Sequence, residues 1–310
     1  RPHSLSVRLA PTVRNREPRA RRTLLPLCSV VRDVSNPDEG PICPTIPVGD
    51  GAPFSLGPDA GRRVLILHGL TGTPWEVRPV GERLASAAYR CTGPLLGGHA
   101  SYEQLRASAW GDWAQSSERW LGELAAKQPI AVIGFSMGAL LALRLAAIAP
   151  GRVAALVCMG TPLVLKPYQR WGIRALGQLA RVPGLDTLTA RIAKPSRTDC
   201  SIRSVAAQYP GFDAFPRSSL LELLRLQATV RPLLSQVRCP TMLIHGGHDH
   251  SAPVGNVQYA AAQLTSAPTT TKVLSRSFHQ IAWDVDATER ADSISTFIQT
   301  HYPPTTTAPC

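Results

Sequence analysis

The sequence predicts an α/β protein with one mostly parallel, doubly wound sheet and a helical insertion. Short apolar runs rich in β-branched residues recur along the chain, and stretches of helix-forming residues separate them. Glycine-rich segments follow two of these runs, as expected of strand-to-helix turns. The chain has 310 residues, 44% of them apolar, which is enough to bury one large core.

The segment Gly-Phe-Ser-Met-Gly at residues 134–138 lies between a strand pattern and a helix pattern. Residues 129–133 predict a buried strand, and residues 139–149 predict a helix that ends before a proline. A serine at this corner is typical of a nucleophile elbow, where a Cβ on either flanking glycine would clash. We expect Ser136 to project into a cleft beside the N–H of Met137, which could stabilise an oxyanion.

A serine nucleophile needs a base, and the base needs a carboxylate to orient it. Residues 240–246 predict a strand and the start of a loop, and Asp249 lies in that loop. Residues 270–274 predict a further strand, and His279 follows it, ahead of a final helix over about residues 285–300. Both side chains therefore follow the carboxyl ends of strands, where open sheets bind ligands. We expect His279 to be the base and Asp249 its partner.

Other residues fit these roles less well. Asp284 and Asp286 follow the expected base and are predicted to start the final helix. His245, His248 and His250 are close to a His-x-His-x-Asp-His zinc pattern. The first spacer has two residues instead of one, however, which turns the second histidine away from a shared ligand. We expect no metal and no cofactor.

A second glycine-rich loop follows the strand predicted over residues 63–67. Residues 68–74 have the sequence His-Gly-Leu-Thr-Gly-Thr-Pro, and a helix is expected from near the proline. An N–H of a loop in this position joins the one after the nucleophile to form an oxyanion hole. We therefore expect Leu70 and Met137 to supply the two backbone donors. The alternative is a turn that only closes a β–α unit.

These segments together resemble the small bacterial carboxylesterases and monoacylglycerol lipases of the α/β-hydrolase superfamily. The resemblance spans about residues 53–301 and is carried by residues 64–74, residues 134–138, the strand and loop that lead to Asp249, and the Ser-Phe-His of residues 277–279. It implies an α/β-hydrolase fold and the following roles: nucleophile Ser136, acid Asp249, base His279, and oxyanion donors Leu70 and Met137.

Three positions depart from the usual pattern of that family. Leu70 stands where phenylalanine is common, Ala100 replaces the second glycine of a Gly-His-Gly, and Phe135 precedes the serine where leucine is common. These differences concern the shape of the acyl pocket and leave the chemistry intact.

The resemblance implies a serine carboxylic-ester hydrolase that forms an acyl-enzyme from a small acyl ester. An acyl thioesterase or an amidase can use the same triad, because the fold positions the nucleophile and the pocket selects the substrate. A binding protein that keeps the fold without catalysis is an alternative from a different class.

About 80 residues lie between the strand predicted over residues 153–159 and the strand that begins near residue 240. The resemblance implies a cap at about residues 161–236, inserted into a domain that spans residues 51–303. We expect most aromatic residues of this insert to form the cap's own small core, namely Tyr168, Trp171, Tyr209, Phe212 and Phe215.

Charge is concentrated at the start of the chain. Residues 1–32 contain eight arginines and one acid, a net of +7 out of the formal +12. Without helical or strand periodicity, residues 1–50 are expected to be a disordered extension rich in Arg and Pro. No aromatic residue is interleaved with these arginines, so nucleic acid is not an expected partner. No apolar run approaches the roughly 20 residues that span a bilayer, so stable membrane insertion is not expected either.

The seven cysteines have neither Cys-x-x-Cys nor zinc-finger spacing. An odd number argues against a complete disulfide framework, and we expect most of them to be small apolar side chains in a reducing compartment. The expected location is therefore the cytoplasm. Export is the alternative, because Arg21 and Arg22 precede a short apolar stretch.

Removing residues 1–40 is expected to leave the melting temperature and the enzymatic activity nearly unchanged, because the segment lacks the apolar periodicity needed to pack on a core. Isoelectric focusing should show a lower isoelectric point, since most of the excess charge is removed. A fall of many degrees in the melting temperature would show that the segment is a structural element.

Overall fold

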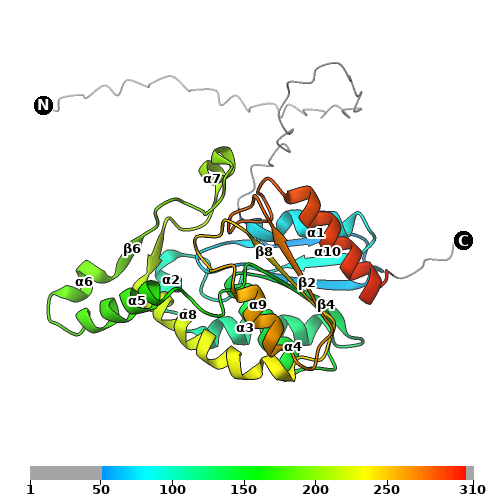
Figure 1. Cartoon of the computed structure of the whole chain (residues 1–310), viewed down its shortest axis with the longest axis horizontal. Helices are drawn as coiled ribbons and strands as arrows, with labels where there is room; N and C mark the ends of the chain where they lie inside the picture. Colours follow the sequence, from blue (N-terminus) through cyan, green and yellow to red (C-terminus); the bar gives the residue numbers. More distant parts are fainter. Residues whose placement is uncertain (1–50, 305–310) are drawn as a thin grey trace, which may run out of the picture. The chain divides into compact units, whose positions relative to one another are not determined.

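The computed structural model describes residues 51–304, so the extension predicted over residues 1–50 lies outside the described residues. A seven-stranded sheet forms the centre of the described part (Figure 1). Strand β1 pairs antiparallel to its neighbour, and the other strands are parallel. The spatial order is β1 (Phe54–Leu56), β3 (Arg90–Gly93), β2 (Arg63–Leu67), β4 (Ile130–Phe135), β5 (Val153–Met159), β8 (Thr241–Gly246) and β9 (Thr269–Leu274).

Helices cover both faces of this sheet. Successive strand residues point to opposite faces, so Leu65 and Val132 belong to one core cluster, whereas Val64 and Ile133 belong to the other. The first cluster includes residues of α3 (Trp110–Leu124), α4 (Met137–Ile148), α8 (Arg217–Val230) and α9 (Asn256–Gln263). The second includes residues of α1 (Arg78–Ala85) and α10 (Ala287–His301). Two short helical segments, η1 (Pro74–Val77) and α2 (Tyr102–Ala107), lie in the loops that follow β2 and β3.

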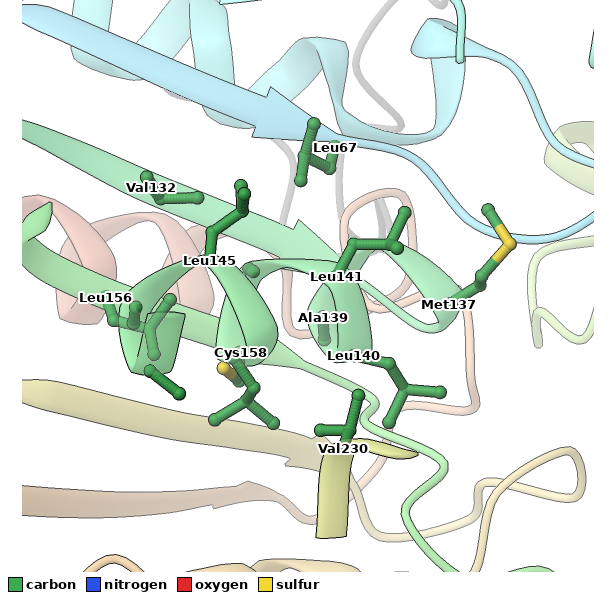
Figure 2. Close-up of a cluster of buried hydrophobic side chains, with 14 of the residues drawn as sticks. Leu67, Val132, Met137, Ala139, Leu140, Leu141, Leu145, Leu156, Cys158 and Val230 are labelled. Carbon is green, nitrogen blue, oxygen red and sulfur yellow. The ribbon is translucent and has the colours of Figure 1, made fainter. Parts of the chain in front are cut away.

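Helix α4 is apolar on almost every side because the fold encloses it, and its one charged residue, Arg144, pairs with Glu118 of α3. It packs on β4 and β5 on one side and on α3 and α8 on others. Figure 2 shows Leu141 and Leu145 facing the strand residues Leu67 and Val132, and Leu140 on the side of Val230 from α8. A helix without a polar face is stable only in such a position. This burial fixes the end of α4 that follows Ser136.

The segment between β5 and β8 contains most of the additional elements. They are α5 (Pro167–Leu179), α6 (Leu185–Thr189), β6 (Arg191–Ala193), α7 (Arg203–Gln208), β7 (Ala214–Pro216), α8 and η2 (Arg231–Gln236). Strands β6 and β7 form a separate antiparallel pair. Helix α8 packs against α3 and α4, and its residues Leu226 and Val230 are buried in their core. In Figure 1, α5, α6 and β6 lie to the left of the central sheet, and α8 leads from them back toward α3 and α4.

The aromatic residues of this segment do not share one core. Tyr168 and Trp171 on α5 are 68% and 75% exposed, so the expectation that they form part of a small cap core is wrong. Tyr209 is buried instead against Trp75 of the main domain, with ring centroids 5.9 Å apart. Amphipathic aromatic side chains occur both on exposed surfaces and in buried contacts, and the sequence pattern alone did not distinguish the exposed residues from the buried one.

Four of the seven cysteines lie in the described part, and all four are free thiols. Burial raises the pKa of Cys91 and Cys200 to about 12 and that of Cys239 to about 11, and it raises the pKa of Cys158 well above its ordinary value. They are therefore protonated small apolar side chains, as predicted. Among residues 51–304, no helix is both long enough and apolar enough to cross a bilayer.

Candidate functional site

Ser136 joins β4 to α4 in a strained turn. Its φ of 53° and ψ of −118° lie where residues other than glycine are rarely found. A Cβ on Gly134 would lie 2.2 Å from the carbonyl oxygen of Gly138, and a Cβ on Gly138 would lie 2.3 Å from that of Leu67. Both distances are far shorter than any real Cβ contact, which confirms the predicted need for two glycines. The turn leaves Ser136 half-buried just beyond the end of β4.

Ser136, His279 and Asp249 form a continuous chain of hydrogen bonds. Nε2 of His279 lies 3.0 Å from Oγ of Ser136, and Nδ1 of His279 lies 2.6 Å from Oδ2 of Asp249. The three residues come from the loops that follow β4, β9 and β8. They meet because these strands are parallel and end at the same edge of the sheet. The structure therefore brings together the three side chains that the sequence selected.

The carboxylate of Asp249 is fully buried and accepts hydrogen bonds on both oxygens. Oδ1 accepts the N–H groups of Ser251 and Ala252, at 2.8 and 2.7 Å. Oδ2 is shared between His279 and Nε2 of His245, which lies 2.9 Å away. These donors hold the carboxylate in one orientation and direct Oδ2 to His279.

The ion pair between Asp249 and His279 controls their protonation. Burial alone would raise the pKa of Asp249, but the charge of His279 and the hydrogen bonds from both histidines lower that pKa well below its ordinary range. Burial alone would lower the pKa of His279, but the charge of Asp249 and its hydrogen bond raise that pKa above 6.5. Asp249 is therefore ionised at neutral pH and favours an imidazolium at His279.

The histidines of the zinc-like pattern have separate partners. His245 contacts the buried carboxylate described above, Nδ1 of His250 lies 3.0 Å from Asp199, and the ring of His248 lies 5.7 Å from that of Phe278. In the part of the chain that the structure describes, no three His, Cys, Asp or Glu side chains are arranged to hold one metal ion. The expectation of a metal-free site stays a prediction.

The glycine-rich loop after β2 lies directly beside the elbow. A Cβ on Gly69 would lie 3.2 Å from the Cβ of Ser136. As the first residue of α4, Met137 has an N–H without an acceptor inside the helix. The N–H of Leu70 donates no hydrogen bond to another residue of the described range 51–304. Two backbone donors are therefore free next to the serine.

The start of this loop is held by a neutral histidine. Nε2 of His68 accepts the N–H of Leu96 at 3.0 Å, so Nδ1 carries the proton and donates to the carbonyl oxygen of Gly69 at 2.9 Å. Burial, together with the neighbouring His99, lowers the pKa of His68 well below 6.5. His68 therefore stays neutral and keeps this tautomer at physiological pH.

Two further carboxylates hold the loop that carries His279. Oδ2 of Asp284 accepts the N–H of Phe278 at 2.7 Å, and Oδ1 accepts the N–H of Ser201 from the insert at 3.2 Å. Asp286 accepts the hydroxyl of Ser277 at 3.0 Å. The prediction that both aspartates start the final helix holds for Asp286, which is the N-cap residue of α10, but not for Asp284, which precedes it. Their carboxylates hold the residues just before the imidazole.

Sequence analysis did not identify Glu76, Asp199 or His245 as neighbours of the site. Glu76 is buried beside the loop after β2, and Asp199 accepts the N–H of His250 at 2.9 Å. The sequence marked Glu76 only weakly, as an acid between the apolar residues Trp75 and Val77 shortly after Gly72. No comparable signal marked Asp199, because its partner is 51 residues away in the chain.

The arrangement is suited to acyl transfer. His279 can take the proton of Ser136 as Oγ attacks a carbonyl carbon, and Asp249 can stabilise the imidazolium that results. The N–H groups of Leu70 and Met137 can stabilise the oxyanion that develops at the same time.

The chain is similar to known hydrolases. The family model described as serine aminopeptidase, S33 matches residues 58–286. The chain is 31% identical over 245 residues to a thermostable monoacylglycerol lipase of Bacillus sp. (strain H-257), covering 77% of this chain and 91% of the relative. It is 26% identical over 192 residues to a carboxylesterase of Bacillus subtilis (strain 168), covering 61% and 72%.

Solved structures confirm the predicted fold class. A structure reported for the metagenome-derived lipolytic enzymes LipS and LipT has a TM-score of 0.73 at 24% identity and covers 81% of this chain and 98% of that one. A monoacylglycerol lipase of Paleococcus ferrophilus has a TM-score of 0.68 at 17% identity, with coverages of 80% and 98%. At these identities the likeness shows the α/β-hydrolase fold.

Asp284→Ala is expected to slow the reaction of Ser136 with a fluorophosphonate by roughly tenfold, because an imidazole that is no longer held in line is a poorer base. Loss of the hydrogen bonds to a buried carboxylate should also cost about 2 kcal/mol of unfolding free energy. The measurements are the labelling rate and a melting curve.

Asp292→Ala provides the control, because Asp292 is an exposed acid on α10 whose ion-pair partner among residues 51–304 is Arg83, at 3.4 Å. The Asp292→Ala substitution should leave both the labelling rate and the melting temperature unchanged. If a folded Asp284→Ala protein were labelled at the wild-type rate, Asp284 would have no part in orienting His279.

Proposed function

The chain belongs to the serine aminopeptidase S33 family of the α/β-hydrolase superfamily, and on that premise we propose that it hydrolyses carboxylic esters with Ser136, His279 and Asp249 as its triad. One observation carries the proposal: the hydrogen-bonded chain from Asp249 through His279 to Ser136, at 2.6 and 3.0 Å. The relatives reported above, a monoacylglycerol lipase and a carboxylesterase, support ester hydrolysis as the reaction.

The reaction follows from this geometry in two halves. Oγ of Ser136 attacks the ester carbonyl carbon while Nε2 of His279 takes its proton, and the oxyanion accepts hydrogen bonds from Leu70 and Met137. The tetrahedral intermediate collapses as His279 returns the proton to the alcohol oxygen, which leaves with it. A water molecule then attacks the acyl-enzyme with the same base, and the carboxylic acid is released.

The substrate we propose is a small ester with an apolar acyl chain, of the monoacylglycerol class. Apolar surroundings support an apolar acyl group: Leu70 and Met137, the two expected oxyanion donors, belong to one buried cluster with Leu163, and Phe212 and Phe215 of the insert pack against this cluster.

We further propose that the protein acts in the cytoplasm. The four cysteines of the described part are free, and protonated buried thiols fit a reducing compartment.

Ser136→Ala is expected to reduce kcat for a p-nitrophenyl ester by roughly 10³- to 10⁶-fold, as triad deletions do in serine hydrolases. The melting temperature should not fall, since the strained position gains nothing from the hydroxyl. Hydrolysis rates and circular dichroism provide the measurements, and monoacylglycerols with graded chains identify the preferred acyl length.

Two outcomes would contradict this proposal. A folded Ser136→Ala protein that kept more than a few per cent of the activity would exclude Ser136 as nucleophile. Activity that EDTA abolished and zinc restored would instead indicate a metal mechanism at the histidine-rich loop. A higher kcat/KM on an acyl thioester than on the matching oxygen ester would change the substrate class and leave the triad in place.

The pH dependence should report His279. Only the neutral imidazole accepts a proton, so kcat/KM is expected to rise with pH through one ionisation whose pKa is above 6.5. Asp249→Asn removes the charge that raises this pKa, so the midpoint should move to lower pH. The plateau should fall by roughly 10⁴-fold, because the asparagine cannot hold the required tautomer. An unchanged midpoint in a folded Asp249→Asn protein would show that Asp249 is not coupled to the base.

A further inference from the structure

Glu76 is a buried carboxyl group that the triad chemistry does not use. It lies in η1 and is 4% exposed. Its Oε2 accepts the N–H of Gly69 at 2.8 Å, and its Oε1 accepts the phenolic hydroxyl of Tyr209 at 2.8 Å. Burial raises its pKa, against the opposing effect of these hydrogen bonds and of the charges of Lys194 and His279. An ionisable group in such a position carries a cost that an apolar side chain would avoid.

The carboxyl group fills the inside of the loop after β2. A Cβ on Gly72 would lie 1.9 Å from Oε2 of Glu76, and a Cβ on Gly69 would lie 3.1 Å from the same oxygen. That Cβ on Gly69 would also lie 3.2 Å from the Cβ of Ser136. The backbone of Gly69 is thus held between Glu76 on one side and the nucleophile on the other.

This contact bears on Leu70 through the planarity of the peptide bond. The carbonyl of Gly69 and the N–H of Leu70 belong to one peptide plane and point in opposite directions. That carbonyl faces Nδ1 of His68 at 2.9 Å and accepts the N–H of Gly72 at 3.2 Å. On its other side, Gly69 donates its own N–H to Oε2 of Glu76. With both sides held, the direction of the Leu70 N–H is determined.

The same carboxyl group connects the loop to the insert. Tyr209 follows α7, and its hydroxyl lies 3.4 Å from the carbonyl oxygen of Thr71 as well as 2.8 Å from Glu76. The N–H of Phe212 donates to that Thr71 carbonyl at 2.9 Å. Thr71 has a φ of 61°, a conformation that needs such support in a residue other than glycine.

We propose that Glu76 is a positioning residue: it fixes the backbone of Gly69 so that the N–H of Leu70 faces the oxyanion, and through Tyr209 it ties this loop to the insert. The inference rests on the proposed role of Leu70 as an oxyanion donor. Glu76 itself does not touch the reacting atoms. Its effect is on the transition state, where the oxyanion develops, and not on binding of the ground-state ester.

The test compares kcat and KM for a p-nitrophenyl ester across three variants of Glu76. Glu76→Ala leaves the N–H of Gly69 without an acceptor, so kcat should fall by roughly 10- to 100-fold with KM within about twofold, less than for outright removal of a donor. Glu76→Asp keeps the charge but withdraws the carboxylate by about 1.5 Å, one C–C bond, so an intermediate loss is expected.

Glu76→Gln should restore most of kcat. Its amide oxygen can accept the N–H of Gly69 while its amide nitrogen donates to Tyr209, whose hydroxyl proton can turn to Thr71. The rate constant for inactivation by a phosphonate, whose P–O group occupies the oxyanion site, should fall in parallel with kcat.

Glu222→Ala is the matched control. Glu222 is also a buried glutamate, 8% exposed, and it accepts the N–H of Trp110 at 3.2 Å, but it lies on α8 and contacts neither glycine-rich loop. It should lower the melting temperature and leave kcat unchanged.

Glu76→Ala and Glu76→Asp proteins with the kcat of Glu222→Ala would overturn the inference, whatever their melting temperatures. If Glu76→Ala does not fold, Glu76→Asp decides alone. A wild-type protein that neither hydrolyses esters nor reacts with a fluorophosphonate would refute the proposed function instead. An active wild type, an inactive Ser136→Ala and a fully active Glu76→Asp would refute only the role of Glu76.

Discussion

The close approach of helix α4 to strands β4 and β2 is the constraint on which the site depends. No side chain can stand between Gly134 and Gly138, since a Cβ on either would lie within 2.3 Å of a backbone carbonyl oxygen. For the chain to pass from β4 into α4 in so tight a turn, the residue between them must take a positive φ, and Ser136 does so. The strain is offset by the burial of an almost entirely apolar helix.

Once the elbow is in place, parallel strand order brings the other groups to it. Strands β2, β8 and β9 end at the same edge as β4, so their loops converge on Ser136 without any long excursion. Each loop is then fixed by buried polar groups. Asp249 is held by two backbone N–H groups and His245, the loop of His279 by Asp284 and Asp286, and the loop after β2 by His68 and Glu76.

The insert contributes to the site mainly through its connecting segments. Asp199 contacts the loop of Asp249, Ser201 contacts Asp284, and Tyr209 contacts Glu76. Thus each of the three loops has at least one polar contact with the same part of the chain. Helix α5, with Tyr168 and Trp171 exposed on its surface, contacts the loop of Asp249 from its first turn, where Nε2 of Gln169 lies 3.5 Å from the carbonyl oxygen of His250.

The fold class and the principal side chains of the site could be predicted because they depend on local patterns. A strand, a glycine, a serine, a second glycine and a helix follow one another within about 20 residues. The positions of Asp249 and His279 relative to two strand patterns were sufficient to select them from several acids and histidines. The final helix was predicted to begin two residues too early, because aspartate is common at helix starts. The hydrogen-bond partners of the Asp284 and Asp286 carboxylates lie outside that helix.

The sequence by itself determined the fold class and was sufficient to select Ser136, Asp249 and His279, because glycine and β-branched residues restrict the backbone locally. Only the tertiary structure decided which buried groups hold those residues in line. The role of His245 depends on how the loop after β8 folds back on that strand, and the roles of Asp284 and Glu76 depend on contacts within their own loops and with the insert. Such contacts leave no periodic signal in the chain, since a carboxylate between apolar residues has the same appearance whether its partner is water or a distant backbone N–H.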